Sequence, residues 1–166
     1  AYGTPKEDAL RRDFTINGLF YDADSFQVID YVGGLKDLKR KRVCTIGDPD
    51  IRFCEDPVRM LRAIRFASRL GFTIERRTWK SVLSNHLEIM KASTARLYEE
   101  MQKFFVYGGG AQSIRLMNKS GLLEDLMPGI SSYLSDSKDR GKLFWRCLKA
   151  LDDHNIDEQS PNVALM

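Results

Sequence analysis

The sequence predicts a mainly α-helical protein with a small β element. Apolar residues recur at the three- and four-residue spacing of amphipathic helices through most of the chain after residue 57. The alternation that is typical of a half-buried strand is found between residues 25 and 46. Glycines and prolines divide the remainder into short segments of helical length, which favours several packed helices over a large sheet.

The first part of the chain is predicted to combine one helix with two strands. The apolar spacing predicts a helix over Lys6–Asp22, and alternation predicts strands over Ser25–Val32 and Lys39–Ile46. The pair Gly33-Gly34 separates the two strands. We expect the strands to form a two-stranded element between residues 26 and 46. A two-stranded pair is only marginally stable alone in water, so it needs other elements to pack against. The strand content therefore resembles the remnant of a larger sheet.

From residue 57 onward the chain is predicted to form a series of helices. A turn over residues 47–50 precedes them, and a polar tail from Asp157, which we expect to be frayed, follows them. Capping residues, glycines and prolines set the ends of each helix. The predicted helices are Pro57–Leu70, Arg76–Ser84, His86–Met90, Thr94–Phe105, Ala111–Lys119, Leu122–Leu126 and Ser137–His154.

Composition narrows the class of protein. No apolar run approaches the roughly 20 residues of a membrane span, so we expect no membrane partner. Cys44, Cys54 and Cys147 are scattered without metal-site spacing, which indicates reduced thiols in an intracellular, reducing compartment such as the cytoplasm or an organelle matrix. Basic residues crowd the first half of the chain, a distribution that suits phosphate-bearing ligands and equally describes a solvated face.

The segment Glu55–Phe66 carries the strongest functional signal. Asp56 is placed to cap a helix whose first residue is Pro57. One turn later, Arg59 would present donors beside the Asp56 acceptor, a combination that can read the edge of a planar base. Arg62 and Arg65 continue the series and could meet phosphates. By spacing alone, a capped amphipathic helix with a solvated basic stripe is the favoured interpretation.

A second dense motif occupies Arg11–Gly18. Arg11 and Arg12 could grip a triphosphate, Asp13 could hold a metal ion or a ribose hydroxyl, and Asn17 could reach the same sugar. The ordinary alternative is a charged amphipathic helix. A third motif, Asp30–Leu38, contains the pair Gly33-Gly34, which could act as a hinge or form an ordinary turn, with Asp37 bonding to neighbouring amides.

In this order and spacing, the three motifs resemble the second, third and fourth motifs of the class II nucleotidyltransferases. That family comprises bacterial-type poly(A) polymerases and CCA-adding tRNA nucleotidyltransferases. The likeness continues through Ala67–Phe72, is weaker at Ser93–Glu100 and Gly121–Pro128, and covers roughly the first 130 residues.

The resemblance implies a domain plan and site roles. Residues 1–54 would be the C-terminal part of a nucleotidyltransferase head, 55–130 an RNA-binding and nucleotide-selecting helical neck and body, and 131–166 a further body helix and tail. The hinge would be Gly33 and Gly34. The implied site residues are Asp13 as a catalytic residue and Arg12, Asn17, Asp56, Arg59, Arg62 and Arg65 as nucleotide-binding residues.

The family chemistry is attack of an RNA 3′-hydroxyl on the α-phosphate of a nucleoside triphosphate, with Mg²⁺ clamped by closely placed carboxylates. This sequence lacks the family's first motif, a Gly-Ser turn followed by an Asp-x-Asp strand that supplies the principal metal ligands. Asp22-Ala23-Asp24 imitates the spacing but follows the second motif. We therefore expect a fragment without its own metal site, inactive alone.

The function that the resemblance implies is template-independent addition of AMP from ATP to RNA 3′ ends, by a polynucleotide adenylyltransferase. The partners would be ATP and the 3′ end of an mRNA or a tRNA. A CCA-adding tRNA nucleotidyltransferase is the alternative within the family. A non-catalytic RNA-binding module and a helical scaffold for a protein partner are the alternatives outside it. The sequence leaves the oligomeric state open.

Overall fold

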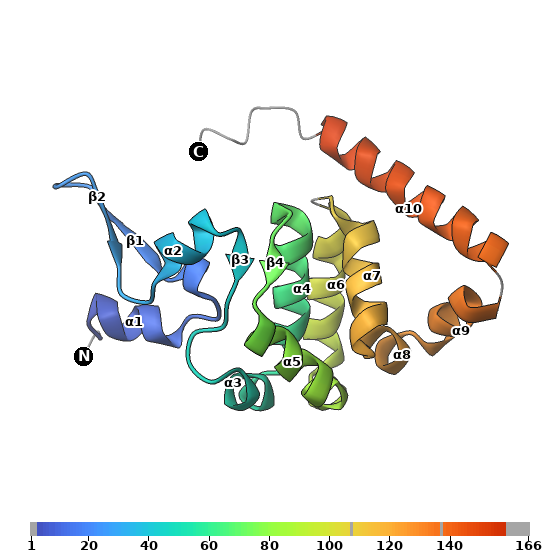
Figure 1. Ribbon diagram of the computed structural model, residues 1–166, viewed down its shortest axis with the longest axis horizontal. Coiled ribbons are helices and arrows are strands. Elements are labelled where there is room, and N and C mark those ends of the chain that lie inside the picture. Colours follow the sequence, from blue (N-terminus) through green and yellow to red (C-terminus); the bar gives the residue numbers. More distant parts are fainter. Residues whose placement is uncertain (1–2, 107, 137, 159–166) are drawn as a thin grey trace.

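The computed structural model describes residues 3–106, 108–136 and 138–158. A small β/α part at the N-terminal end is followed by a stack of helices, and the last helix runs along the far side of that stack (Figure 1). The predicted mainly helical class with a small β element is confirmed.

The N-terminal part differs from the predicted helix and hairpin. Helix α1 covers only Pro5–Arg11, with a capping box between Thr4 and Glu7. A 3₁₀ turn at Thr15–Asn17 and strand β1, Leu19–Asp22, follow it, so the predicted helix over Lys6–Asp22 is wrong beyond its first two turns. The helical spacing is interrupted because buried Phe14 pairs in extended conformation with Thr45, which leaves the backbone unable to continue the helix.

Strand pairing is also different from the prediction. Strand β2, Gln27–Asp30, pairs antiparallel with β1, with Leu19 opposite Asp30. Strand β3, Arg42–Val43, pairs in parallel with β4, Thr73–Ile74, across two intervening helices. The expected pairing of residues 25–32 with 39–46 is therefore wrong, because helix α2, Gly34–Lys39, turns the chain away between them.

Most of the predicted helices are present, with ends within about two residues, the usual scatter of helix boundaries; the last one extends to Glu158, four residues beyond its predicted end. The segment predicted at His86–Met90 is a 3₁₀ helix, and α2, α3 and α9 were not predicted. The observed bounds are α3 Pro49–Glu55, α4 Val58–Leu70, α5 Arg76–Asn85, η2 His86–Lys91, α6 Thr94–Val106, α7 Gly110–Ser120, α8 Leu122–Leu126, α9 Pro128–Asp136 and α10 Lys138–Glu158. The predicted turn at residues 47–50 holds the start of α3, and residues 159–166 of the predicted tail lie outside the described residues.

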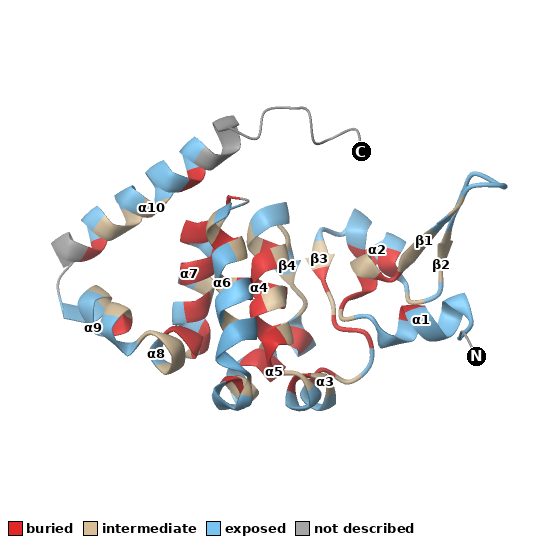
Figure 2. Cartoon of the chain, turned by 180° about the vertical axis from the view of Figure 1, so that it is seen from behind, coloured by how far each residue is buried: buried red, intermediate tan, exposed pale blue. Residues whose placement is uncertain are grey.

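The main core surrounds α4, whose apolar face is fully buried (Figure 2). Its residues come from α3, α4, α5, η2, α6, α7 and α8, and the largest include Phe53, Met60, Ile64, Phe104 and Met117. Burial of one such side chain contributes about 1.5–3 kcal/mol. This core fixes α4 and α6 side by side, which decides how their charged side chains meet.

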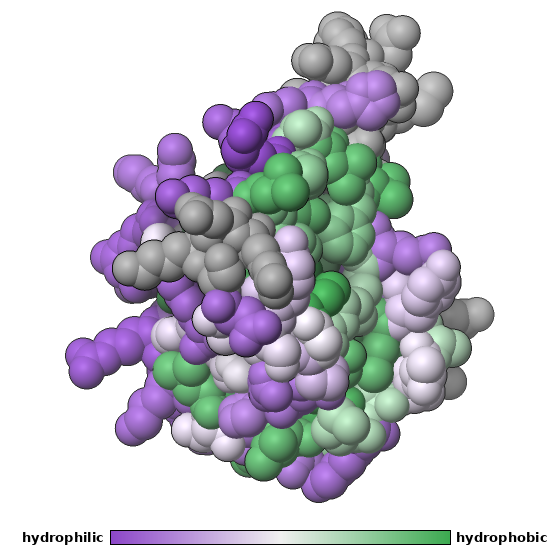
Figure 3. Space-filling model, turned by 90° about the vertical axis from the view of Figure 1, so that its right-hand side faces the viewer, coloured by the Kyte–Doolittle hydropathy of each residue, from purple (hydrophilic) through white to green (hydrophobic). Residues whose placement is uncertain are grey.

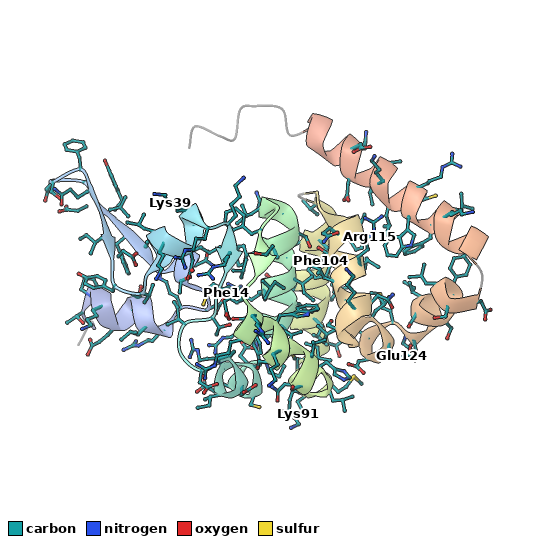
Figure 4. The ribbon with its side chains drawn as sticks, in the orientation of Figure 1. Phe14, Lys39, Lys91, Phe104, Arg115 and Glu124 are labelled. Carbon is teal, nitrogen blue, oxygen red and sulfur yellow. The ribbon has the colours of Figure 1, made fainter. Side chains whose placement is uncertain are left out.

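A smaller core joins the β/α part to α4. Phe14 lies where the two parts meet (Figure 4) and packs edge-on against Phe66, with ring centroids 5.8 Å apart. Val43, Ala63 and Ala67 complete this cluster. Because Phe14 follows Asp13 directly, its burial holds the Asp13 carboxylate close to α4.

The last helix is fastened to the stack by a carboxylate. Asp152 on α10 is buried and accepts hydrogen bonds from the amides of Gly110 and Ala111 at 2.7 and 3.0 Å, which caps the start of α7. Apolar side chains gather at the end of the molecule where α9 and α10 lie (Figure 3). Tyr133 and Leu143 are among the exposed ones, and Phe144 and Trp145 are partly buried against the core.

Candidate nucleotide site

An open pocket of about 400 Å³ lies between the end of α1 and the middle of α4. Its lining residues are Arg12, Asp13, Asn17 and Arg62, so three of the predicted site residues from the second motif meet one from the fourth. The Asp13 carbonyl accepts a hydrogen bond from the Ile46 amide at 3.0 Å, which anchors this stretch of backbone. The pocket is therefore built by tertiary contacts between segments far apart in the sequence.

Asp13 is held by two arginines of α4. Its Oδ2 atom lies 2.6 Å from Arg62 Nη2, and its Oδ1 atom lies 3.3 Å from Arg59 Nε. The Asp13 side chain is only 16% exposed. This carboxylate is thus neutralised by the protein's own cations, which is a different environment from that of a free metal ligand.

Asp56 and Arg59 form the predicted pair, although Asp56 does not cap α4. Asp56 ends α3, and α4 begins at Val58 with Pro57 as its N-cap residue, because the chain turns sharply between the two helices. Asp56 Oδ2 lies 3.9 Å from Arg59 Nε and accepts a hydrogen bond from Arg96 Nη2 at 2.8 Å. Neither Asp56 nor Arg59 lines this pocket, but Arg59 adjoins its wall, with Nε 3.3 Å from Asp13 Oδ1.

Two atoms of this pair lack hydrogen-bond partners. Asp56 Oδ1, an acceptor, and Arg59 Nε, a donor, are both buried without one. The Arg59 Nε contacts to Asp13 and Asp56 are close in distance but do not have hydrogen-bond geometry. Buried polar atoms without partners are rare in folded proteins and call for an explanation, such as a functional role or a bound water molecule.

Burial raises the pKa of the Asp56 carboxyl, but the hydrogen bond from Arg96, the charges of Arg96 and Arg59, and the nearby Val58 amide outweigh it. The net pKa lies below the ordinary value of 3.8. Asp56 is therefore ionised at neutral pH and acts as an acceptor only.

The guanidinium of Arg59 is oriented by its own neighbourhood. Its Nη1 atom donates to the Arg52 carbonyl at 3.2 Å and to Glu55 Oε2 at 3.3 Å. Arg52 in turn donates to Glu55 and to the carbonyls of Arg11 and Arg12. These contacts connect α3 and the second motif to the side chain that was predicted to read a base.

Arg65 departs from the predicted series of phosphate-binding arginines. It is 8% exposed, and its Nε atom donates to Glu100 on α6 at 2.9 Å. Arg65 is covered because α6 packs over this face of α4, and a nucleotide-binding role for Arg65 stays a prediction. Arg62 takes an intermediate position: it lines the pocket and also lies 3.5 Å from Glu100.

Arg12 and Asn17 meet at the other wall of the pocket. Arg12 Nη1 donates to the Asn17 carbonyl at 2.9 Å, and its Nη2 donates to Asp8 at 3.0 Å. The Arg12 guanidinium also lies 4.9 Å from the centre of the Phe20 ring. Arg11 is exposed and does not line this pocket.

The predicted hinge is a tightly tied turn. The Asp30 carboxylate accepts hydrogen bonds from the amides of Val32, Gly33, Gly34 and Leu35 at 2.8–3.0 Å. Asp30, not Asp37, therefore satisfies these amides, whereas Asp37 accepts from Thr15 and Arg42. A hinge role for Gly33 and Gly34 stays a prediction.

Two residues of α6 complete the site and were not predicted. Arg96 bonds to Asp56, and the buried Glu100 bonds to Arg65, Lys103 and, at longer range, Arg62. A signal was available, because Glu100 falls on the same helical face as the core residues Leu97 and Phe104. Outside this site, His86 Nδ1 lies 2.6 Å from Asp125 Oδ2.

Nowhere in the described part of the chain do three or more His, Cys, Asp or Glu side chains gather in a way that could hold a metal ion. Asp13 is the one carboxylate on the pocket wall, and two arginines already neutralise it. These residues do not fit a Mg²⁺ site by themselves. Across the same described residues, no helix has the length and apolar character needed to cross a bilayer.

Two family descriptions match the chain in series. "Poly A polymerase head domain" matches residues 1–44, and "Probable RNA and SrmB- binding site of polymerase A" matches residues 71–134. Poly(A) polymerase I of Escherichia coli is 43% identical over 99% of this chain, and the same enzyme of Haemophilus influenzae is 36% identical over 99%. The CCA-adding enzyme of Bacillus velezensis is 38% identical over 76%.

The chain belongs to the class II nucleotidyltransferase family. It spans 36% of the length of the Escherichia coli relative, 37% of the Haemophilus influenzae relative and 32% of the Bacillus velezensis relative. Membership in the class II nucleotidyltransferases confirms the resemblance that the three motifs predicted.

Solved structures of class II nucleotidyltransferases share the fold. The Bacillus stearothermophilus CCA-adding enzyme in complex with CTP gives a TM-score of 0.69 at 34% identity, covering 73% of this chain and 30% of that one. The Thermotoga maritima CCA-adding enzyme complexed with tRNA gives 0.65 at 33% identity, covering 75% and 31%.

Proposed function

We propose that this chain forms the base-selecting wall of an RNA nucleotidyltransferase that adds AMP from ATP to RNA 3′ ends. The observation that carries this proposal is the buried pair of unsatisfied atoms, the acceptor Asp56 Oδ1 and the donor Arg59 Nε. The Watson–Crick edge of adenine offers the complement, an amino donor next to a ring-nitrogen acceptor. Uracil carries the carbonyl acceptor O4 where adenine carries its amino donor, so in the same orientation O4 would face the Asp56 acceptor and bind less well.

Cytosine presents the same donor–acceptor order as adenine, so the geometry fits both ATP and CTP. The relatives favour the adenine-specific reaction, because the poly(A) polymerase I sequences align with 99% of this chain and the CCA-adding enzymes with 76–93%. A CCA-adding enzyme is the second candidate, and the solved CCA-adding enzymes with TM-scores near 0.7 support it.

In this proposal the pocket side chains receive the nucleotide's phosphates and sugar. Arg12 and Arg62 would face the triphosphate, Asp13 and Asn17 the ribose, and Asp13 would be the catalytic residue of the chain. Arg65 would act only through Glu100, since both are buried. Mg²⁺, which the family likeness implies, would need carboxylates besides Asp13, and we assign no step to it.

The RNA 3′ end is proposed to lie on the helices within residues 71–134, the range of the RNA-binding family match. Basic side chains there would make the affinity fall with salt, as counterion release requires. The proposed compartment is a reducing one, because Cys44, Cys54 and Cys147 are free thiols. Burial raises the pKa of the Cys44 thiol to about 11, which makes it unreactive.

The test is a nucleotide-binding titration of the chain with ATP, CTP, GTP and UTP, comparing wild type with Asp56→Ala. We expect wild type to prefer ATP over UTP, and we expect Asp56→Ala to reduce that preference by about tenfold, the value of one good base-edge contact. Asp153→Ala, which removes an exposed carboxylate on α10, is the matched control. Equal affinity for ATP and CTP would favour the CCA-adding reaction, and RNA binding with no nucleotide preference would favour a non-catalytic module.

A further inference from the structure

Helix α6 contributes the two residues at the ends of a series of charged side chains that runs through the site. The charges alternate along the series Arg96, Asp56, Arg59, Asp13, Arg62 and Glu100. Its first and last members, Arg96 and Glu100, both lie on α6, one helical turn apart. The series is therefore closed through the backbone of a helix that lines no part of the pocket.

Arg96 engages only one oxygen of Asp56. Its Nη2 atom donates to Oδ2 at 2.8 Å and leaves Oδ1 without a partner. The Arg96 side chain is 55% exposed, whereas the Asp56 side chain is 21% exposed. A half-exposed arginine that pins one oxygen of a largely buried carboxylate fixes the direction of the other oxygen.

Glu100 engages the opposite end. It is 5% exposed, lies 2.9 Å from Arg65 Nε and 3.0 Å from Lys103 Nζ, and reaches Arg62 at 3.5 Å. Arg62 holds Asp13 with another of its nitrogens. Glu100 therefore limits where Arg62, and through it Asp13, can lie.

We propose that Arg96 is a positioning residue for base selection: it directs the free oxygen of Asp56 toward the amino group of an incoming adenine. This inference rests on the proposed function, since it assigns a role toward the same nucleotide. Glu100 anchors the same helix turn, so that α6 sets the base-reading and phosphate-facing ends together. Arg96 touches neither substrate nor reacting atoms in this arrangement.

The experiment compares Arg96→Gln and Arg96→Lys with wild type. Two quantities are measured: the ratio of ATP to UTP affinity, and the pH titration of the Asp56 carboxyl carbon by NMR. We expect Arg96→Gln to lower the affinity ratio by about tenfold, as for loss of one charge-assisted hydrogen bond, and to raise the Asp56 pKa. Arg96→Lys should restore the Asp56 pKa through its charge and recover only part of the ratio, because lysine lacks the planar fork.

Arg77→Gln is the matched control. Arg77 is also an exposed arginine with a carboxylate partner, Asp48, at 2.7 Å, and it is not part of the series of charged side chains from Arg96 to Glu100. It should leave both measured quantities unchanged. The groups that face the Asp56 carboxyl are Arg96 from α6 and Arg59 from α4, with Glu55 and Asp13 bound to Arg59, so the titration reports on this neighbourhood.

Failure of this inference is distinguishable from failure of the proposed function. If Asp56→Ala abolishes the ATP preference while Arg96→Gln leaves it intact, the positioning role is overturned and the proposed function stands. An Arg96→Gln variant that shifts the Asp56 pKa with no change in the ratio has the same meaning. If Asp56→Ala itself leaves the preference unchanged, the proposed function fails and this inference fails with it.

Discussion

Asp13 and Arg62 are 49 residues apart in the sequence, and their Oδ2 and Nη2 atoms lie 2.6 Å apart. This ion pair joins the β/α part of the chain to the middle of α4. It also brings the second and fourth motifs together, so that residues of both line one pocket.

Removal of a phosphate-facing arginine should weaken triphosphate binding. We expect Arg12→Gln to raise the dissociation constant of inorganic triphosphate by about tenfold, because a charged hydrogen-bond donor leaves the pocket wall. Arg40→Gln, at an exposed position outside this pocket, is the control. Isothermal titration calorimetry measures both, and equal constants would place the triphosphate elsewhere.

Loss of the Glu100 charge should be costly because it leaves the buried Arg65 guanidinium without its counter-charge. We expect Glu100→Gln to reduce the free energy of unfolding by about 3–5 kcal/mol. Its neighbour Glu99 has a 65% exposed side chain and pairs with the same lysine, so Glu99→Gln should change stability by less than about 1 kcal/mol. Urea unfolding of the two variants tests this, and similar midpoints would show that Glu100 is not essential to the core.

Acid should destabilise the protein through Glu100. Burial raises the pKa of this carboxyl. Hydrogen bonds from Lys103 and Arg65, together with the charges of these two residues, lower the pKa by more than burial raises it, so the net pKa lies below the ordinary 4.5. A carboxyl whose pKa is depressed in the folded state stabilises that state above 4.5, and the contribution is lost as pH falls through the folded pKa.

The wild type should therefore lose stability steeply as the pH falls below about 4.5, whereas Glu100→Gln should show a shallower dependence. Asp56, whose pKa is also lowered, adds to the slope in both proteins. Urea titrations at a series of pH values measure the two curves. Parallel curves would mean that Glu100 binds its proton equally well in the folded and unfolded states.

The two adjacent glycines should differ in their tolerance of alanine. A Cβ atom on Gly34 would lie 2.2 Å from the Thr15 carbonyl oxygen, so Gly34→Ala should force the backbone apart. Gly33 has open space but a φ of +80°, for which alanine costs about 1–2 kcal/mol. We expect the larger loss of thermal stability in Gly34→Ala, and the reverse order would contradict the close approach at Thr15.

Nucleotide incorporation provides a further check. We expect the 166-residue chain by itself to transfer no labelled AMP to RNA in the presence of Mg²⁺, because its described residues gather no metal-ligating cluster. Measurable incorporation that depends on Asp13 would show that this carboxylate binds metal despite its two arginine partners.

Local sequence patterns were sufficient for most helices and for the family. The spacing of apolar residues around the arginines of residues 58–70 predicted α4 nearly to its ends, since helix formation there depends on nearest turns and caps. The order of three motifs was likewise enough to identify the family, because residue type and spacing are carried by the chain itself.

Strand pairing, and whether each arginine of α4 is exposed or buried, depended on tertiary contacts that no local sequence pattern contains. β3 pairs with β4 rather than with its predicted neighbour because two helices bring residues 73–74 beside it. Arg62 and Arg65 look equivalent along α4, yet one lines a pocket and the other is buried. The difference is the packing of α6, which places the Glu100 carboxylate over Arg65: an ion pair between distant segments forms only after the core has fixed two helices side by side.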